Sequence, residues 1–157
     1  MAKRLTELQR LQSTSLGYAL IRCGQLFNER AMAKVNAGAA EFKLREAHTR
    51  LLPHLQAHDG IRLGDLAKKL DVTKQAVQQL IADMVDGGFV QLDVDPDDSR
   101  ARRARLTELG IAASLHGTSV LIALEKELEL GKRDAKELHR LLSRVLMALE
   151  VEAPDVA

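Results

Sequence analysis

The stretch DLAKKLDVTKQAVQQLIADMVDGGFVQLDVDPDDSRARRARL, from Asp65 to Leu106, decides the fold. Its first part predicts a short helix over 65–70, in which the small Ala67 lets a second helix approach closely. A turn over 71–73 follows. Asp65 and Thr73 can each cap the helix that they precede, because their side-chain oxygens accept hydrogen bonds from unpaired N–H groups. The pattern is typical of a helix-turn-helix.

The second helix, which begins after Thr73, has an apolar face and a polar face. The apolar face consists of Val77, Leu80, Ile81 and Met84. The polar face consists of Lys74, Gln75, Gln78 and Gln79. Glutamine can form two hydrogen bonds to adenine in the major groove, and lysine can contact a guanine edge or a phosphate. A polar helix face is most often only solvated, but the hairpin that follows favours DNA binding.

A β-hairpin is predicted after this helix. Gly87 and Gly88 end the helix, Phe89–Leu92 has strand composition, and the Asp-Pro-Asp-Asp sequence over 95–98 is typical of a turn. The returning segment over 99–106 carries four arginines and no acidic residue. Guanidinium groups on such a hairpin can enter a narrow minor groove. The expected fold class is mainly α with a small β-hairpin wing.

Taken together, these motifs resemble the MarR family of bacterial transcriptional regulators. The matching motifs are Leu66-Ala67, Thr73-Lys74-Gln75-Ala76-Val77, Gly88-Phe89-Val90, Asp95-Pro96-Asp97-Asp98-Ser99-Arg100 and Leu106-Thr107-Glu108-Leu109-Gly110. The resemblance is strongest over residues 61–110 and implies a regulator that binds double-stranded DNA sequence-specifically, expected to be a repressor released by a small molecule. It also implies that Arg100 enters the minor groove while Asp98 orients it.

The residues predicted to contact DNA are Thr73, Lys74, Gln75, Gln78, Gln79, Asp98, Arg100, Arg102 and Arg103. The chain departs from the family pattern at two places. Leu92 and the acidic Asp93 stand where many relatives have a basic residue, so a phosphate contact is in doubt there. Asp71 replaces the glycine often found in the turn, which the fold tolerates because aspartate adopts left-handed geometry better than most residues.

Composition fits a globular protein of one domain or a tightly joined pair. The 157 residues are 46% hydrophobic and only 3% aromatic, so the core must be aliphatic, as in helices that pack along aliphatic seams. A net charge of +1 gives no sign of a polyanionic partner. Only local clustering of basic side chains can provide DNA affinity, which should therefore be modest away from specific sites and sensitive to salt.

The chain is expected to be cytoplasmic. It has a single cysteine, Cys23, which excludes an internal disulfide. The N-terminus resembles no signal peptide, and no apolar run approaches the roughly 20 residues of a membrane span. Because Cys23 lies on an apolar stripe with Leu16, Leu20 and Phe27, it is predicted to be a buried structural thiol rather than a redox sensor.

Helices are predicted on both sides of the winged motif. On the N-terminal side they span residues 5–37, with an interruption over 13–17, and 41–57, where Pro53 should mark a kink or a boundary. Ile61-Arg62-Leu63 can form a minor strand against the wing. On the C-terminal side, Thr107 can cap a helix that runs to about Leu130 and stops at Gly131. A capping box at Asp134 then opens a last helix.

The predicted organisation is an N-terminal helical region over 1–58, a winged helix-turn-helix over 59–106 and a C-terminal helical region over 107–157. The apolar stripe of the last helix is formed by Leu138, Leu141, Leu142, Val145 and Leu149. These terminal stripes can pack on the chain's own wing domain, but the resemblance favours dimerisation helices that interlock in a homodimer. Two recognition helices would then contact the half-sites of a pseudo-palindromic operator.

The resemblance also implies a pocket for a small aromatic or phenolic acid near the terminal helices. Candidate lining residues are Tyr18, Arg22, Arg45, His48 and His116. The alternative is that Arg22 and Arg45 only pair with nearby acids such as Glu29 or Glu46. His54 and His58, one turn apart, could hold a metal, but ordinary polar histidines are the more common case, and no metal site or cofactor is expected.

Two other functions compete with DNA binding. A winged-helix module that binds protein without DNA is the alternative, for which the acidic Asp93 on the outgoing strand is the best argument. An enzyme is not expected, because the sequence has no phosphate loop, no nucleophile elbow and no convincing set of metal ligands.

Overall fold

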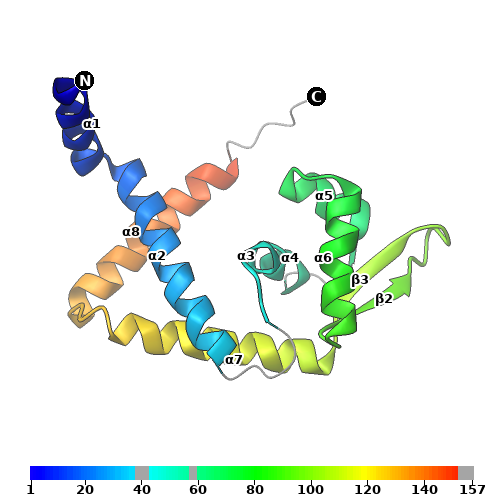
Figure 1. Cartoon of the computed structure of the whole chain (residues 1–157). Helices are drawn as coiled ribbons and strands as arrows, with labels where there is room; N and C mark the ends of the chain where they lie inside the picture. Colours follow the sequence, from blue (N-terminus) through cyan, green and yellow to red (C-terminus); the bar gives the residue numbers. More distant parts are fainter. Residues whose placement is uncertain (38–42, 57–59, 152–157) are drawn as a thin grey trace. The chain divides into compact units, whose positions relative to one another are not determined.

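The computed structural model describes residues 1–37, 43–56 and 60–151. It divides into two compact units, Met1–Val120 and Leu121–Ala157. The elements in chain order (Figure 1) are α1 (Ala2–Thr14), α2 (Leu16–Ala37), α3 (Glu46–Thr49), α4 (Leu52–Gln56), β1 (Ile61–Arg62), α5 (Leu63–Leu70), α6 (Lys74–Asp86), β2 (Val90–Val94), β3 (Arg102–Leu106), α7 (Glu108–Lys126) and α8 (Lys132–Val151). The predicted fold class, mainly helical with a small wing, is confirmed.

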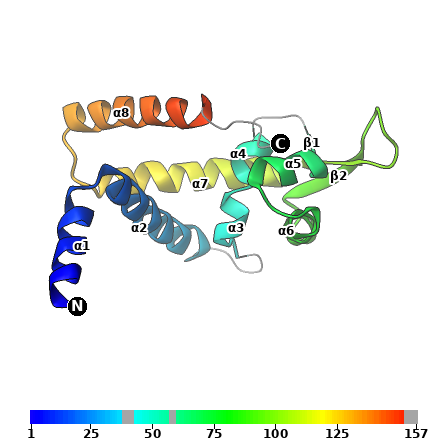
Figure 2. The same cartoon turned by 90° about the horizontal axis from the view of Figure 1, so that it is seen from above.

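The three strands form one antiparallel sheet in the order β1-β3-β2. Val90 lies opposite Leu106 and Val94 opposite Arg102, while Ile61 on β1 lies opposite Ala104. The predicted minor strand over 61–63 is therefore present, although Leu63 already begins α5. The tip of the β2-β3 hairpin projects away from α5 and α6 in both views (Figures 1 and 2).

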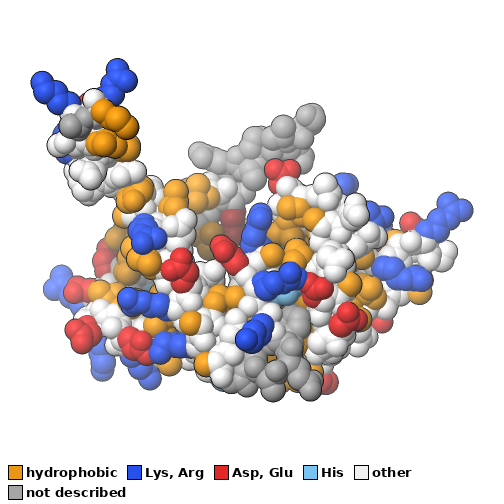
Figure 3. Space-filling view, in the orientation of Figure 1, with side chains coloured by type: hydrophobic (Ala, Val, Ile, Leu, Met, Phe, Trp, Pro, Cys, Tyr) orange, Lys and Arg blue, Asp and Glu red, His pale blue; other side chains and the backbone are white. Residues whose placement is uncertain are grey.

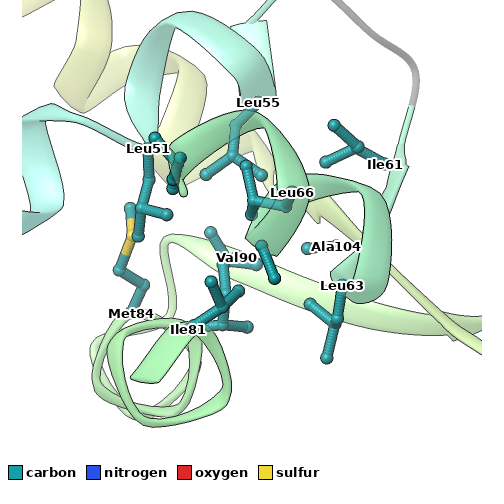
Figure 4. Packing of buried hydrophobic residues seen from close by; sticks show 12 residues of the cluster. Leu51, Leu55, Ile61, Leu63, Leu66, Ile81, Met84, Val90 and Ala104 are labelled. Atoms are coloured by element: carbon teal, nitrogen blue, oxygen red, sulfur yellow. The ribbon is translucent and has the colours of Figure 1, made fainter. Parts of the chain in front are cut away.

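An aliphatic core joins α4, β1, α5, α6 and the sheet. In Figure 4 the side chains of Leu55, Leu66, Ile81 and Val90 point toward one another from four different elements. The predicted stripe of α6 is buried at Val77, Ile81 and Met84, while Leu80 is half-buried against the same core. At roughly 25 cal/mol per Å² of apolar surface, this burial is what holds the small sheet and the helix pair together.

Local signals set most boundaries of the helix-turn-helix. Thr73 Oγ1 accepts a hydrogen bond from the Ala76 N–H at 3.1 Å, as predicted for a cap. Asp71 takes the left-handed conformation with φ of 51°, and Gly88, after α6, has φ of 75°. The predicted start of the first helix at Asp65 is wrong: α5 begins at Leu63 and Arg62 precedes it without a side-chain cap. Strand β1 ends at Arg62 and the buried Leu63 is already the first residue of α5, so there is no loop between the strand and the helix.

The single helix predicted over 41–57 is also wrong where the structure describes it. Two short helices, α3 and α4, are separated at Arg50 and Leu51, and residues 41, 42 and 57 lie outside the described part. Pro53 lies in the first turn of α4. Proline fits there because its missing N–H is not needed, whereas in a continuous helix its ring would clash with the carbonyl one turn earlier. Leu51 at the break is fully buried.

The N-terminal helix is interrupted at Ser15, within the predicted range. Ser15 Oγ accepts from the Tyr18 N–H at 3.2 Å, so the interruption also caps α2. The prediction that Cys23 is buried is wrong, because its side chain is exposed in this chain. The stripe on which it lies remains largely uncovered, as the 68% exposure of Leu16 indicates.

The C-terminal boundaries differ from those predicted. Helix α7 ends at Lys126 rather than near Leu130, and Glu129 takes a positive φ of 54° before Gly131 is reached. Helix α8 then begins at Lys132, so Asp134 lies in its first turn and does not cap it as predicted. The acid still suits that turn because helix N-termini favour negative charge. Within the described ranges, the helices are all too short or too polar to cross a membrane.

Candidate nucleic-acid interface

Helix α6 presents a polar surface at its N-terminal end. Lys74, Gln75, Gln78 and Gln79 are all exposed there. Burial of Val77 and Ile81 on the opposite side fixes the rotation of the helix, so these four side chains cannot turn inward. Their exposure agrees with the predicted polar face.

The four residues differ in their local partners. Gln79 donates from Nε2 to Asp83 Oδ1 at 3.2 Å, one helical turn further along. Within the described chain, neither Gln75 nor Gln78 has a side-chain hydrogen bond to an acid. Helix α6 therefore carries one restrained glutamine and two unrestrained ones.

Asp83 connects α6 to the segment that begins α3. Its Oδ2 forms an ion pair with the Arg45 guanidinium and lies 3.6 Å from His48 Nε2. His48 Nδ1 accepts from the backbone N–H of Arg45 at 3.1 Å. The His48 ring is only 1% exposed, and this burial, together with the nearby charge of Arg45, lowers its pKa below the ordinary value of 6.5. Both effects favour the neutral imidazole.

A buried carboxylate holds the turn of the wing. Asp95, 2% exposed, accepts at Oδ2 from Arg62 Nε at 2.6 Å and at Oδ1 from Arg62 Nη2 at 2.7 Å. Its Oδ1 also accepts from the backbone N–H groups of Asp97 and Asp98. These hydrogen bonds, led by that from Arg62, lower the pKa of Asp95 to about 2. From the sequence alone, Asp95 was predicted only to lie in a turn.

The arginines of the wing fall into two groups. Arg100 and Arg102 are exposed near the tip, where Figure 3 shows basic side chains projecting from the surface. Arg103 donates to the Gly60 carbonyl at 2.7 Å, and Arg105 pairs with Asp93 at 3.2 Å. The exposed pair is available to a partner, while the other two hold the sheet together.

Asp98 acts on Arg100 through the backbone. Its Oδ1 accepts from the Arg100 N–H at 3.0 Å, which is the geometry of an Asx-turn. The carboxylate therefore sets the direction of the chain at Arg100 and leaves the guanidinium exposed.

The Leu-Thr-x-x-Gly motif joins the end of α6 to the start of α7. Thr107 Oγ1 accepts from the Gly110 N–H at 3.0 Å, as expected of a cap, and donates to the Gly88 carbonyl at 2.6 Å. A Cβ at Gly110 would clash with the Phe89 carbonyl oxygen. Glycine is required at this position because the backbones approach too closely for any side chain.

The five candidate effector residues are only partly brought together. Arg45 and His48 are in contact, with 3.3 Å between Arg45 Nη2 and His48 Nε2. Tyr18, Arg22 and His116 are exposed, and the described contacts include no side-chain bond from them to Arg45 or His48. Arg45 pairs with an acid, as the alternative held, but with Asp83 rather than Glu29 or Glu46.

An open hollow of about 430 Å³ lies elsewhere, at the base of the wing. It is lined by Gly60, Ile61, Arg62, Asp65, Lys69, Asp97 and Arg103. Over the described ranges, no group of three His, Cys, Asp or Glu side chains is arranged to hold a metal ion. His58 of the proposed histidine pair lies outside those ranges.

Comparison with known proteins finds one family model that matches part of the chain and several solved structures that share its fold. A model described as the MarR family matches residues 43–101. No curated protein matches the sequence. Solved structures do match, at identities of 22–24% at which the likeness concerns the fold.

Three of these structures cover most of both chains. MepR, a transcription regulator of the Staphylococcus aureus multidrug efflux pump MepA, is 23% identical with a TM-score of 0.65, over 86% of this chain and 98% of that chain. MarR from E. coli in its apo form is 24% identical with a TM-score of 0.63, over 84% and 97%. The transcriptional repressor CouR, bound to a 23-mer DNA duplex, is 22% identical with a TM-score of 0.68, over 87% and 95%.

Proposed function

We propose that the chain is a MarR-family winged-helix regulator, a DNA-binding protein and not an enzyme, and that it represses transcription as a homodimer on a pseudo-palindromic operator. The observation that carries the proposal is the exposed polar face of α6 beside an arginine-bearing wing. CouR, which has the same fold, is a repressor bound to duplex DNA. The protein would act in the cytoplasm, where its operator is.

Each exposed side chain has a role that its chemistry suits. Gln75 and Gln78 contact base edges in the major groove, and Lys74 contacts guanine or a phosphate. Thr73 presents the positive end of α6 to a phosphate. Arg100 enters the minor groove and Arg102 contacts the backbone beside it. Arg103, which is bonded to Gly60, supports the wing instead of making a primary contact.

The homodimer is supported by the apolar side chains that the terminal helices leave uncovered. Leu16 on α2 is 68% exposed, and Leu142 and Leu146 on α8 are 42% and 58% exposed. Stripes of this kind at helical spacing are normally covered by another helix. A second copy would cover them and would place two recognition helices on two half-sites.

Release by a small aromatic or phenolic acid is the regulatory part of the proposal. Tyr18, Arg22 and His116 are exposed and available to a ligand, whereas Arg45 already has Asp83 as its partner. An anion that displaced Asp83 from Arg45 would act directly on α6. The test is a panel of aromatic acids assayed for operator release and thermal stabilisation, with Arg22→Ala and Arg45→Ala alongside. If no acid changes either quantity, this part of the proposal fails.

A protein-binding module without DNA affinity is the competing function. Its best argument was the acidic Asp93 on the outgoing strand. Asp93 pairs with Arg105 on the neighbouring strand, so its charge is largely compensated within the sheet. The observation that favoured the alternative is thereby weakened.

The decisive experiment selects DNA sites from a random pool with the purified protein and measures their affinity across salt concentrations. Gln75→Ala and Gln78→Ala should each weaken selected sites by about 1–3 kcal/mol and relax base preference. Gln25→Ala, at an exposed glutamine of α2, is the matched control. Absence of any selected site, or binding unchanged in both α6 variants, would refute the proposal.

The wing requires a separate test. Arg100→Ala should lower affinity for operators with A/T-rich flanks more than for G/C-rich flanks, because a narrow A/T-rich minor groove attracts guanidinium most strongly. Arg133→Ala removes an exposed arginine from the first turn of α8 and serves as the control. An equal loss on both kinds of flank would leave Arg100 as a phosphate contact.

A further inference from the structure

The side-chain amide of Gln79 is hydrogen-bonded to a carboxylate, that of Asp83. Asp83 Oδ1 accepts from Gln79 Nε2 at 3.2 Å, while Asp83 Oδ2 pairs with Arg45. Both carboxylate oxygens are thus engaged, one by the recognition helix and one by the segment before α3. The Asp83 side chain is 27% exposed, so solvent competes with these bonds only in part.

Arg45, the partner of Asp83 in the ion pair, is itself held in place by neighbouring residues. Arg45 contacts His48 through its backbone N–H, at 3.1 Å from Nδ1, and through Nη2, at 3.3 Å from Nε2. The adjacent Leu44 exchanges two hydrogen bonds of 2.9 Å with the side chain of Asn36, near the end of α2. Asp83 is therefore held by the guanidinium of Arg45, and the residue before Arg45, Leu44, is hydrogen-bonded to α2.

This arrangement decides which end of the Gln79 amide is free. An ionised carboxylate accepts hydrogen bonds and cannot donate them. Rotation of the amide by 180° would place its oxygen against a carboxylate oxygen, with two acceptors and no proton between them. The amide nitrogen consequently faces Asp83 and the carbonyl oxygen Oε1 faces away. Gln75 and Gln78 lack such a restraint among the described residues, so their amides can rotate.

We propose that Asp83, held by Arg45, is a specificity-determining positioning residue: it presents the Gln79 carbonyl oxygen to the major groove, so that the operator position beneath Gln79 prefers adenine or cytosine. This rests on the proposed function. Adenine N6 and cytosine N4 donate a hydrogen bond in the major groove, whereas guanine O6 and N7 and thymine O4 accept one. A fixed acceptor on the protein selects the bases that donate.

The test compares base preference at every operator position for the parent, Gln79→Ala, Asp83→Asn and Arg45→Ala. Gln79→Ala identifies the position that Gln79 contacts, where the parent should prefer adenine or cytosine by at least about fivefold. Asp83→Asn replaces the carboxylate with an amide that can also donate, so that the Gln79 amide can turn over. The preference at that one position should fall to about twofold or less, with the other positions unchanged. Arg45→Ala should reduce it in the same direction.

Asp86→Asn is the matched control, because it removes the same charge from the exposed side of the same helix. It should leave the preference at the Gln79 position as in the parent.

A purely structural role for Asp83 would lower stability or overall affinity without changing the preference at a single position. Three results would overturn the inference while the proposed function stands: a preference for guanine or thymine, no change with Gln79→Ala, or an unchanged preference in both Asp83→Asn and Arg45→Ala. A parent that selects no DNA site would refute the proposed function and this inference with it.

Discussion

The winged motif and the terminal helices contain the same types of aliphatic residue, but these are buried in the motif and exposed on the terminal helices. In the motif, Leu66, Val77 and Ile81 are completely buried within one chain. On α8, Leu142 and Leu146 are 42% and 58% exposed, although they follow an equally regular helical spacing. The motif closes its own core because helices and strands surround it on several sides. On the terminal helices, the apolar side chains of Leu16, Leu142 and Leu146 stay exposed.

This contrast indicates where each region gains its stability. The motif should fold through contacts within the chain, reinforced by the paired charges of Arg62 and Asp95 and of Arg45 and Asp83. The terminal helices should gain theirs from a second copy, so that their stability depends on protein concentration.

The largest effect is expected on α8. In the proposed homodimer, Leu142→Asp would place a carboxylate in the apolar seam between two copies, at a cost of several kcal/mol, on the order of that for an unpaired buried charge. We expect a monomeric or unfolded protein in sedimentation, with operator binding lost. Arg144→Asp places the same group outside the apolar stripe and should remain dimeric. A parent protein that sediments as a stable monomer would contradict the dimer directly.

Within the motif, the largest effect is expected at Gly110. Gly110→Ala would push a methyl group against the Phe89 carbonyl oxygen and should lower the free energy of unfolding by about 1–3 kcal/mol. Gly64→Ala is the control, since nothing lies within 4 Å of a Cβ there. It should be neutral or stabilising by about 0.5 kcal/mol. Urea denaturation of both variants decides the matter, and equal effects would show that the close approach is not needed.

The pair of Asp95 and Arg62 should make the wing sensitive to acid. The pKa of Asp95 is about 2 in the folded protein and close to 3.8 when unpaired, so its contribution is complete well above pH 3.8 and is lost as the pH falls toward 2. Asp95→Asn should therefore be less stable than the parent at pH 6, and the difference should shrink below pH 4. Asp97→Asn, at a side chain that is 80% exposed, should differ little from the parent at any pH. A difference independent of pH would contradict the ion pair.

The smallest effect is expected at the cap of α6. Thr73→Ala removes the acceptor for the Ala76 N–H and should cost about 1 kcal/mol of stability. Thr118→Ala changes the same side chain within α7, where it bonds only to the Ser114 carbonyl, and should be nearly neutral. The comparison uses thermal unfolding of the two variants. Similar melting temperatures would indicate that the start of α6 is set by packing and not by its cap.

The accuracy of the sequence-based predictions follows the distance along the chain over which each feature is determined. The Thr73 cap, the left-handed Asp71 and the buried stripe of α6 involve neighbours within two helical turns, and all three are present. The prediction of one helix over 41–57 was wrong because it followed the regular spacing of apolar residues. The local signal for a break in this segment was Pro53, and the chain there forms two short helices. The start of α5 was misplaced because burial of Leu63 against the sheet overrode a good capping residue at Asp65.

The candidate interface divides in the same way. The glutamines of α6 were predicted from periodicity, and Arg100 was singled out among the wing arginines by the family resemblance; all are exposed. The internal use of Arg103 was not, because its acceptor is the carbonyl of Gly60, 43 residues earlier in the chain. Nothing in the local sequence distinguishes Arg103 from Arg102, which stays exposed on the adjacent position of the same strand.

The sequence by itself determined the order of the elements in the winged motif, the face that each of its helices buries and the chemistry of its turns. These properties depend on side-chain spacing and on hydrogen bonds between near neighbours. Only the tertiary structure decided which charges are paired. Asp95 meets Arg62 across 33 residues, and Asp83 meets Arg45 across 38. Such pairs form only after the chain has folded, because packing of the apolar core brings their elements together.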